Sequence, residues 1–225
     1  MVIMRGFLAV VFSLTGLSLF AQTHTTQIAP GAREQFDALL NKPAMVEPVG
    51  IMPLGKNWFR LTTDAHVITG DAGFEQIAAV LLDSKNTSEI FNGKKGKLLG
   101  DIVNQTADEA IVDFTMISFA PLGIQIKTPY RASVKKVAKT ETKLILEIRQ
   151  LASDSAMNKD IKDLFATRYA EEIVIADKKY TYIRIYALDD VNASILPGAR
   201  GILESAAIPS NIEALELIIA AAKKR

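Results

Sequence analysis

The chain has 225 residues, of which 49% are hydrophobic and 23% charged, and it contains no cysteine. Its 26 basic and 25 acidic residues nearly balance, so it lacks the basic surplus that binding to nucleic acid or to an anionic membrane surface requires. Without cysteine there is no disulfide framework, and the fold must depend on its hydrophobic core.

Residues 1–21 have the three-part pattern of a secretory signal peptide. Arg5 supplies one positive charge, residues 6–20 are apolar, and Ala21 is a small residue suited to cleavage. The apolar run is shorter than the roughly twenty residues that span a bilayer. We expect cleavage after Ala21 and a periplasmic or secreted protein. Leu19 is an unusual residue for its place before the cleavage site, so an uncleaved membrane anchor stays the alternative.

Residues 22–55 are expected to form an N-terminal arm ahead of a main domain at 56–225. A short helix is predicted over 32–40, and the rest of the arm is a loop rich in proline and glycine, which rarely lie inside regular structure. We expect this arm to pack on the domain or to link it to the cell envelope.

The first long strand is predicted over 58–68, where apolar or small side chains alternate with polar ones. A period of two places the first set on a buried face and the second set, which includes Asp64 and His66, in water. We therefore interpret Asp64 and His66 as a solvated surface pair rather than a catalytic one.

Two short helices are predicted after this strand. An apolar helical period begins at Phe74, behind Asp71 as a potential N-cap, and a second helical turn covers 87–91. The basic segment 93–97 joins this turn to the next strand. We interpret it as a solvated turn and not as a phosphate-binding loop.

The hydrophobic period returns to two from residue 97 onward. Seven short strands with tight turns predict an antiparallel meander rather than parallel units with crossover helices. A helical turn is expected at 159–165. The expected strands are 98–104, 109–119, 123–127, 130–138, 143–151, 167–176 and 180–187.

The chain ends in an amphipathic helix predicted over 210–225, after a short helical piece at 200–207. Ser210 and Glu213 have the spacing of a capping box. Ile219 belongs to an apolar stripe along one side of this helix. A helix with one apolar face needs a sheet to cover that face.

The order of these elements resembles the START-like or polyketide-cyclase-like superfamily (SRPBCC), also called the helix-grip fold. The resemblance covers 58–225 and is carried by residues 71–93, the strand series and the helix at 210–225. It implies an α+β fold in which a curved antiparallel sheet wraps around a long C-terminal helix. It also implies a cavity between sheet and helix that binds a hydrophobic ligand such as a lipid, sterol or polyketide.

Strand faces that would line such a cavity are apolar, although a fully packed core is the alternative for each residue. For the row formed by Tyr180, Tyr182, Arg184 and Tyr186 we favour an exposed contact face. In the alternative, this row lines the pocket and Arg184 faces an acidic ligand head group. The candidate ligand-binding residues are Val112, Phe114, Met116, Leu146, Ile148, Ile183, Arg184, Ile185 and Ile219.

Few residues are suited to catalysis. His24 and His66 are the two histidines, and no nucleophile elbow, phosphate loop or cluster of metal ligands is present in the sequence. We predict no catalytic residue, metal or cofactor.

The primary hypothesis is a protein that binds a hydrophobic small molecule or lipid in the periplasm or outside the cell. Two alternatives stay open. One is a cyclase-type or hydrolase-type enzyme of the same fold that uses Arg184, Tyr169 or Glu171. The other is a structural or interaction module of the cell envelope that contacts a partner through the arm and through the row of tyrosines and Arg184.

Overall fold

The computed structural model describes residues 35–119, 125–151, 160–192 and 199–225. Within it, Phe36–Arg225 form one compact unit. The predicted signal peptide and His24 lie outside the described residues. The helices are α3 (Phe36–Leu39), α4 (Phe74–Leu82), α5 (Thr87–Ile90) and α6 (Ala199–Ala222). The strands are β1 (Ala44–Met45), β2 (Gly50–Gly55), β3 (Trp58–Thr69), β4 (Gly96–Gln105), β5 (Glu109–Phe119), β6 (Gln125–Lys139), β7 (Lys143–Gln150), β8 (Ile161–Ile175) and β9 (Lys178–Asn192).

All of these strands belong to one antiparallel, curved sheet that does not close. Its order is β1-β3-β9-β8-β7-β6-β5-β4, and β2 also pairs with β3. From β4 to β9 each strand pairs with the next along the chain, which confirms the predicted meander. On its other side β9 pairs with β3, a strand that precedes the meander in the chain.

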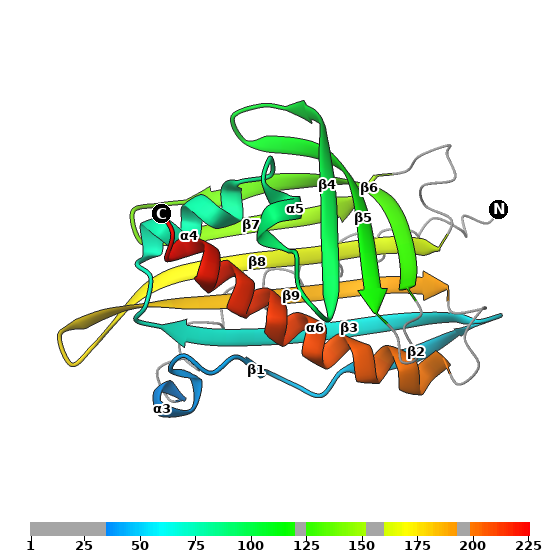
Figure 1. The fold of residues 1–225 in the computed structure, drawn as a ribbon, viewed down its shortest axis with the longest axis horizontal. Helices are drawn as coiled ribbons and strands as arrows, with labels where there is room; N and C mark the ends of the chain where they lie inside the picture. The colour runs from blue at the N-terminus through cyan, green and yellow to red at the C-terminus, as the bar shows by residue number, and fades with distance from the viewer. Residues whose placement is uncertain (1–34, 120–124, 152–159, 193–198) are drawn as a thin grey trace, which may run out of the picture. The chain divides into compact units, whose positions relative to one another are not determined.

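The two faces of the sheet have different roles. On one face, which we call the helix face, α6 lies across the strands, and α4 and α5 lie near its C-terminal end (Figure 1). Ala65 and Val67 of β3 and Ile183 of β9 are fully buried there in a core shared with α4 and α6. Alternate residues of the same strands, such as His66 and Arg184, point to the opposite side, which we call the reverse face.

The terminal helix is one continuous element rather than the two predicted pieces. It runs through Pro209, where the missing N–H removes one bond of the helix ladder, and Asn211 donates its side-chain N–H to the Ala207 carbonyl at 2.9 Å. Among the described residues, Gly201–Ala222 is long and apolar enough to cross a membrane. Its C-terminal half instead packs on the sheet, where Leu215 and Ile218 are fully buried.

The predicted capping box is wrong, because Ser210 lies inside α6 and not at its start. Glu213 instead accepts hydrogen bonds from the backbone N–H groups of Lys94 and Lys95, at 2.7 Å each. The turn before β4 has exposed lysine side chains, as predicted. Its backbone nonetheless fastens this edge of the sheet to the middle of α6.

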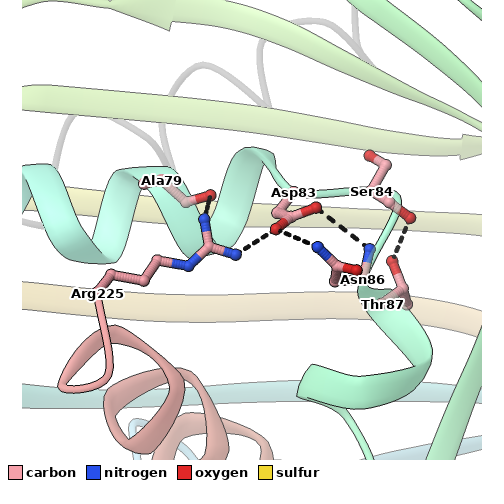
Figure 2. A network of polar contacts seen from close by, with 6 residues as sticks. All are labelled: Ala79, Asp83, Ser84, Asn86, Thr87 and Arg225. Atoms are coloured by element: carbon pink, nitrogen blue, oxygen red, sulfur yellow. Dashed lines mark hydrogen bonds and ion pairs between the residues drawn. The ribbon is translucent and has the colours of Figure 1, made fainter.

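A second polar contact holds the end of α6. Arg225 donates a hydrogen bond to the Ala79 carbonyl of α4 at 3.2 Å and forms an ion pair with Asp83 (Figure 2). The same carboxylate accepts two hydrogen bonds from Asn86, the N-cap residue of α5. The C-terminus of α6, the end of α4 and the start of α5 are therefore joined through one carboxylate.

Several expected boundaries differ from the structure. The strands predicted at 123–127 and 130–138 are one strand, β6, which passes through Pro129. The helical turn predicted at 159–165 is wrong, since β8 begins at Ile161. Gly73, not Asp71, is the N-cap of α4 and its N–H is bound by the Gln76 side chain.

Part of the predicted arm belongs to the sheet. Its Pro/Gly-rich stretch contains β1 and β2, and both strands pair with β3. Of the helix expected at 32–40, the described part of the chain contains the four residues of α3, Phe36–Leu39. Because β2 lies at the edge of the sheet, Pro53 can occupy it without removing a central ladder bond. The proposed boundary between arm and domain at residue 55 stays a prediction.

The reverse face of β3 and β9 is buried where solvent was expected. Asp64 and His66 are both less than a tenth exposed, so the prediction of a solvated pair is wrong. Tyr182 and Arg184 are buried as well, while Tyr180 and Tyr186 are half-buried. The favoured reading of this row as an exposed aromatic face is therefore wrong too.

Candidate functional site

A cavity of about 220 Å³ lies between the sheet and α6. It separates two hydrophobic clusters, one beneath α4 and the C-terminal half of α6 and the other along β5, β6 and the bulged start of β8. Most of its wall is apolar. Lining residues include Phe91, Leu98, Met116, Tyr130, Ile148, Leu164, Ala166, Arg168, Ile185, Ala187, Asp189, Ala214 and Leu217.

The hollow begins part of the way along β8 and β9. On the helix face of these strands, Ala170 and Ile183 are fully buried. Two residues further along, Arg168 and Ile185 keep accessible surface, as do Ala166 and Ala187 beyond them. One end of the sheet is thus closely packed under the helix and the other is hollow.

Arg168 places a positive charge in this apolar wall. Its guanidinium carbon lies 4.8 Å from the centre of the Phe91 ring, which fixes the group by a cation–π contact. No hydrogen bond or ion pair to Arg168 is found among the described residues. Burial lowers its pKa, and nearby Tyr130 opposes that effect.

Asp189 places a carboxyl group in the same wall. Its Oδ1 atom is buried and has no hydrogen-bond partner in the described part of the chain. Burial, with the charge of neighbouring Asp190 as the second cause, raises the pKa of Asp189 to about 7. Asp190 itself points to the other side, where Arg60 donates two hydrogen bonds to it at 2.7 and 2.8 Å.

Tyr130 is electrostatically coupled to both of these groups. Burial raises the pKa of its hydroxyl, the charge of Asp189 raises it further, and the charge of Arg168 lowers it. The Tyr130 ring packs against Phe114 with the ring centres 5.4 Å apart. Protein atoms enclose Arg168 and Asp189, yet both keep accessible surface. That surface faces the cavity.

The candidate ligand-binding residues fall into three groups. Met116, Ile148 and Ile185 line the cavity. Arg184 lies on the reverse face in an ion pair with Asp64, so it does not face the cavity. The others, which pack in the core beside the cavity and do not line it, are Val112, Phe114, Leu146, Ile183 and Ile219.

Sequence reasoning missed three polar residues of the wall, Tyr130, Arg168 and Asp189. Arg168 falls between Ala166 and Ala170 at the strand period of two, so its position on the helix face was readable once β8 was assigned. Tyr130 likewise shares a face with Ala132. Asp189 could not be found in this way, because the last strand was expected to end at residue 187.

The residues considered for catalysis lie away from the cavity. The Tyr169 hydroxyl donates a hydrogen bond to Glu171 at 2.6 Å on the reverse face, and burial together with that bond raises the tyrosine pKa. His66 Nδ1 lies 3.2 Å from the Tyr182 hydroxyl. Burial lowers the pKa of His66, although the charge of Asp64 opposes this.

A metal site is not found in the described residues, since no three histidine or carboxylate side chains there lie close enough together to hold an ion.

Comparison with known proteins bears on the fold. No protein-family model and no curated protein sequence matches the chain. Among solved structures, human StAR-related lipid transfer protein 5 is similar with a TM-score of 0.56 and 10% identity, over 92% of this chain and 98% of that one. Zhui aromatase/cyclase from Streptomyces sp. R1128 is similar with a TM-score of 0.53 and 13% identity, over 74% and 95%. The chain therefore has the START-like, polyketide-cyclase-like helix-grip fold.

Proposed function

We propose that this protein binds a small hydrophobic molecule in the cavity between the sheet and α6. The observation that carries the proposal is a partly open, mostly apolar hollow of about 220 Å³ between two closely packed parts of the core. Protein interiors seldom leave voids larger than a water molecule. An engineered apolar cavity of about 150 Å³ already binds benzene.

Similar structures support this proposal through what their names say. One is a lipid transfer protein and the other an aromatase/cyclase. The hydrophobic wall formed by Leu98, Met116, Ile148 and Leu217 suits an apolar ligand body.

The size of the cavity bounds the ligand. It falls below the roughly 300–1,000 Å³ of pockets that hold drug-sized molecules. In proportion to benzene, it accommodates roughly nine non-hydrogen atoms. A whole phospholipid requires the cavity to widen, whereas a single short chain or a small ring system fits as it stands.

Binding without transformation is the favoured form of this function. Tyr169, Glu171 and Arg184 occupy the reverse face, engaged with one another or with Asp64. The signal-peptide pattern at 1–21 supports the further proposal that binding takes place in the periplasm or outside the cell. A contact between the arm and an envelope protein stays a separate proposal.

Calorimetric titration with octan-1-ol, a neutral probe with nine non-hydrogen atoms, tests the proposal. We expect saturable binding of one molecule per chain, with a Kd in the range of about 10 µM to 1 mM. Solvent extraction of the purified protein followed by mass spectrometry then identifies any ligand that it carries. Absence of saturable octan-1-ol binding, together with an extract free of apolar molecules, contradicts the proposal.

A further inference from the structure

Arg168 differs from every other arginine whose side chain the structure describes. The other five each form an ion pair with a carboxylate, and Arg168 alone in this set has none. The five pairs are Arg60 with Asp190, Arg131 with Asp113, Arg149 with Glu147, Arg184 with Asp64 and Arg225 with Asp83.

A buried guanidinium without an ion-pair partner lowers the stability of the folded protein. It carries five N–H donors and stays protonated at any pH near neutrality. The ring of Phe91 covers one face of the planar guanidinium. It accepts no hydrogen bond from the N–H groups, which point outward in the plane of the guanidinium. The in-plane donors of Arg168 therefore lack an acceptor within the described residues, and an acceptor that enters the cavity relieves the cost of burying them.

Asp189 does not supply this acceptor. Both side chains face the cavity, yet no ion pair joins them in the described part of the chain. Burial favours the protonated form of Asp189, which is neutral. A protonated carboxyl can donate a hydrogen bond, and so can the hydroxyl of Tyr130.

Lys97 and Glu213, the other charged residues of the wall, balance each other. With Asp189 protonated, the wall therefore carries one net positive charge, and most of the rest of it is apolar. We propose that the ligand is an amphipathic anion whose carboxylate, or a similar acidic group, binds the guanidinium of Arg168 while its apolar body fills the hollow. Planar, bidentate geometry makes arginine well matched to a carboxylate. This inference rests on the proposed function, because it names the chemical class of the molecule that the cavity binds.

Two matched probes test the inference. Octanoate and octan-1-ol have the same chain length and differ in the charge of the head group, and both are titrated at pH 6, where octanoate is ionised and Asp189 is mostly protonated. We expect octanoate to bind at least tenfold more tightly. Arg168→Met should abolish this preference, so that the two probes bind this variant with affinities within about twofold of each other.

Two further variants serve as controls. Arg149→Met also removes an arginine, but from the half-exposed pair with Glu147 on the reverse face, and it should retain the preference for octanoate. Arg168→Lys keeps the charge without the planar fork, and it should retain part of the preference.

The possible outcomes are distinct. If neither probe binds the wild-type protein, the proposed function itself fails. If both bind equally well, or if the preference persists in Arg168→Met, the cavity binds apolar molecules and the anion inference is overturned. Should Arg168→Met not fold, carbon-13 NMR of carboxyl-labelled octanoate on the wild-type protein decides. A bound carboxyl pKa below that of free octanoate supports the inference, and an unchanged or raised value overturns it.

Discussion

The guanidinium of Arg184 on β9 donates two hydrogen bonds to the carboxylate of Asp64 on β3, on the side of the sheet opposite the cavity. Both side chains are about nine-tenths buried. The pair explains why two charged residues occupy a buried row. It also explains why Arg184 is unavailable to a ligand in the cavity, which Arg168 lines instead.

Removal of one partner of this pair should destabilise the fold strongly. Asp64→Ala leaves a buried guanidinium without its anion, and we expect the free energy of unfolding to fall by about 3–5 kcal/mol. Urea denaturation measures the change. Asp64→Leu combined with Arg184→Met should recover most of this loss, and its affinity for octan-1-ol should equal that of the wild type. A double variant as unstable as Asp64→Ala contradicts this account.

The contact between Glu213 and the turn before β4 depends on the glycine at position 93. A Cβ atom there would lie 2.5 Å from Glu213 Cδ and 2.9 Å from the Gly96 carbonyl oxygen. We expect Glu213→Ala to lower the free energy of unfolding by about 1–2 kcal/mol, because two backbone hydrogen bonds are lost. Gly93→Ala should lower the free energy of unfolding less in the Glu213→Ala background than in the wild type, because its Cβ atom no longer clashes with the carboxylate. A double-mutant cycle compares these losses. If Gly93→Ala lowers the free energy of unfolding equally in both backgrounds, the contact does not form as described.

Asp189 should make the stability of the fold depend on pH. Its pKa is about 7 in the folded protein and about 3.8 without the protein environment, so folding binds a proton between these values. The contribution of Asp189 to stability should therefore be greatest below about pH 4, fall as the pH rises toward 7 and level off above it. Asp189→Asn should be more stable than the wild type at pH 8, by on the order of 3 kcal/mol, and equal to it at pH 4.

Thermal unfolding of both proteins between pH 4 and pH 8 gives this difference. A stability difference between the wild type and Asp189→Asn that does not change with pH contradicts the raised pKa of Asp189. Other titratable or charged groups that face the cavity are Lys97, Tyr130, Arg168, Tyr186 and Glu213, and all five are unchanged in the comparison.

The element order and the helix face were predictable from hydrophobic period. Alternation on β3 correctly placed Ala65 and Val67 toward the helices. The same alternation misplaced Asp64 and His66, because a polar residue in a strand is ordinarily solvated and only its partner, here Arg184 or Tyr182, shows that it is buried.

The cavity itself was not predictable residue by residue. Ala166 and Ala170 have the same side chain, strand and face, yet Ala166 lines the cavity and Ala170 is fully packed. The difference arises from where α6 crosses the sheet, which depends on long-range packing. For the same reason, Met116, Ile148 and Ile185 reach the cavity whereas Val112 and Leu146 fill the core.

These two alanines also provide the most direct test of the binding cavity. Ala166→Leu adds three carbon atoms to the hollow, whereas Ala170→Leu forces them into a packed core, and the comparison combines octan-1-ol calorimetry with urea denaturation. We expect Ala166→Leu to lose at least tenfold in affinity while its stability stays within about 1 kcal/mol of the wild type, and Ala170→Leu to lose about 1–3 kcal/mol of stability. Unchanged octan-1-ol binding by a folded Ala166→Leu protein would contradict the claim that the ligand occupies this cavity.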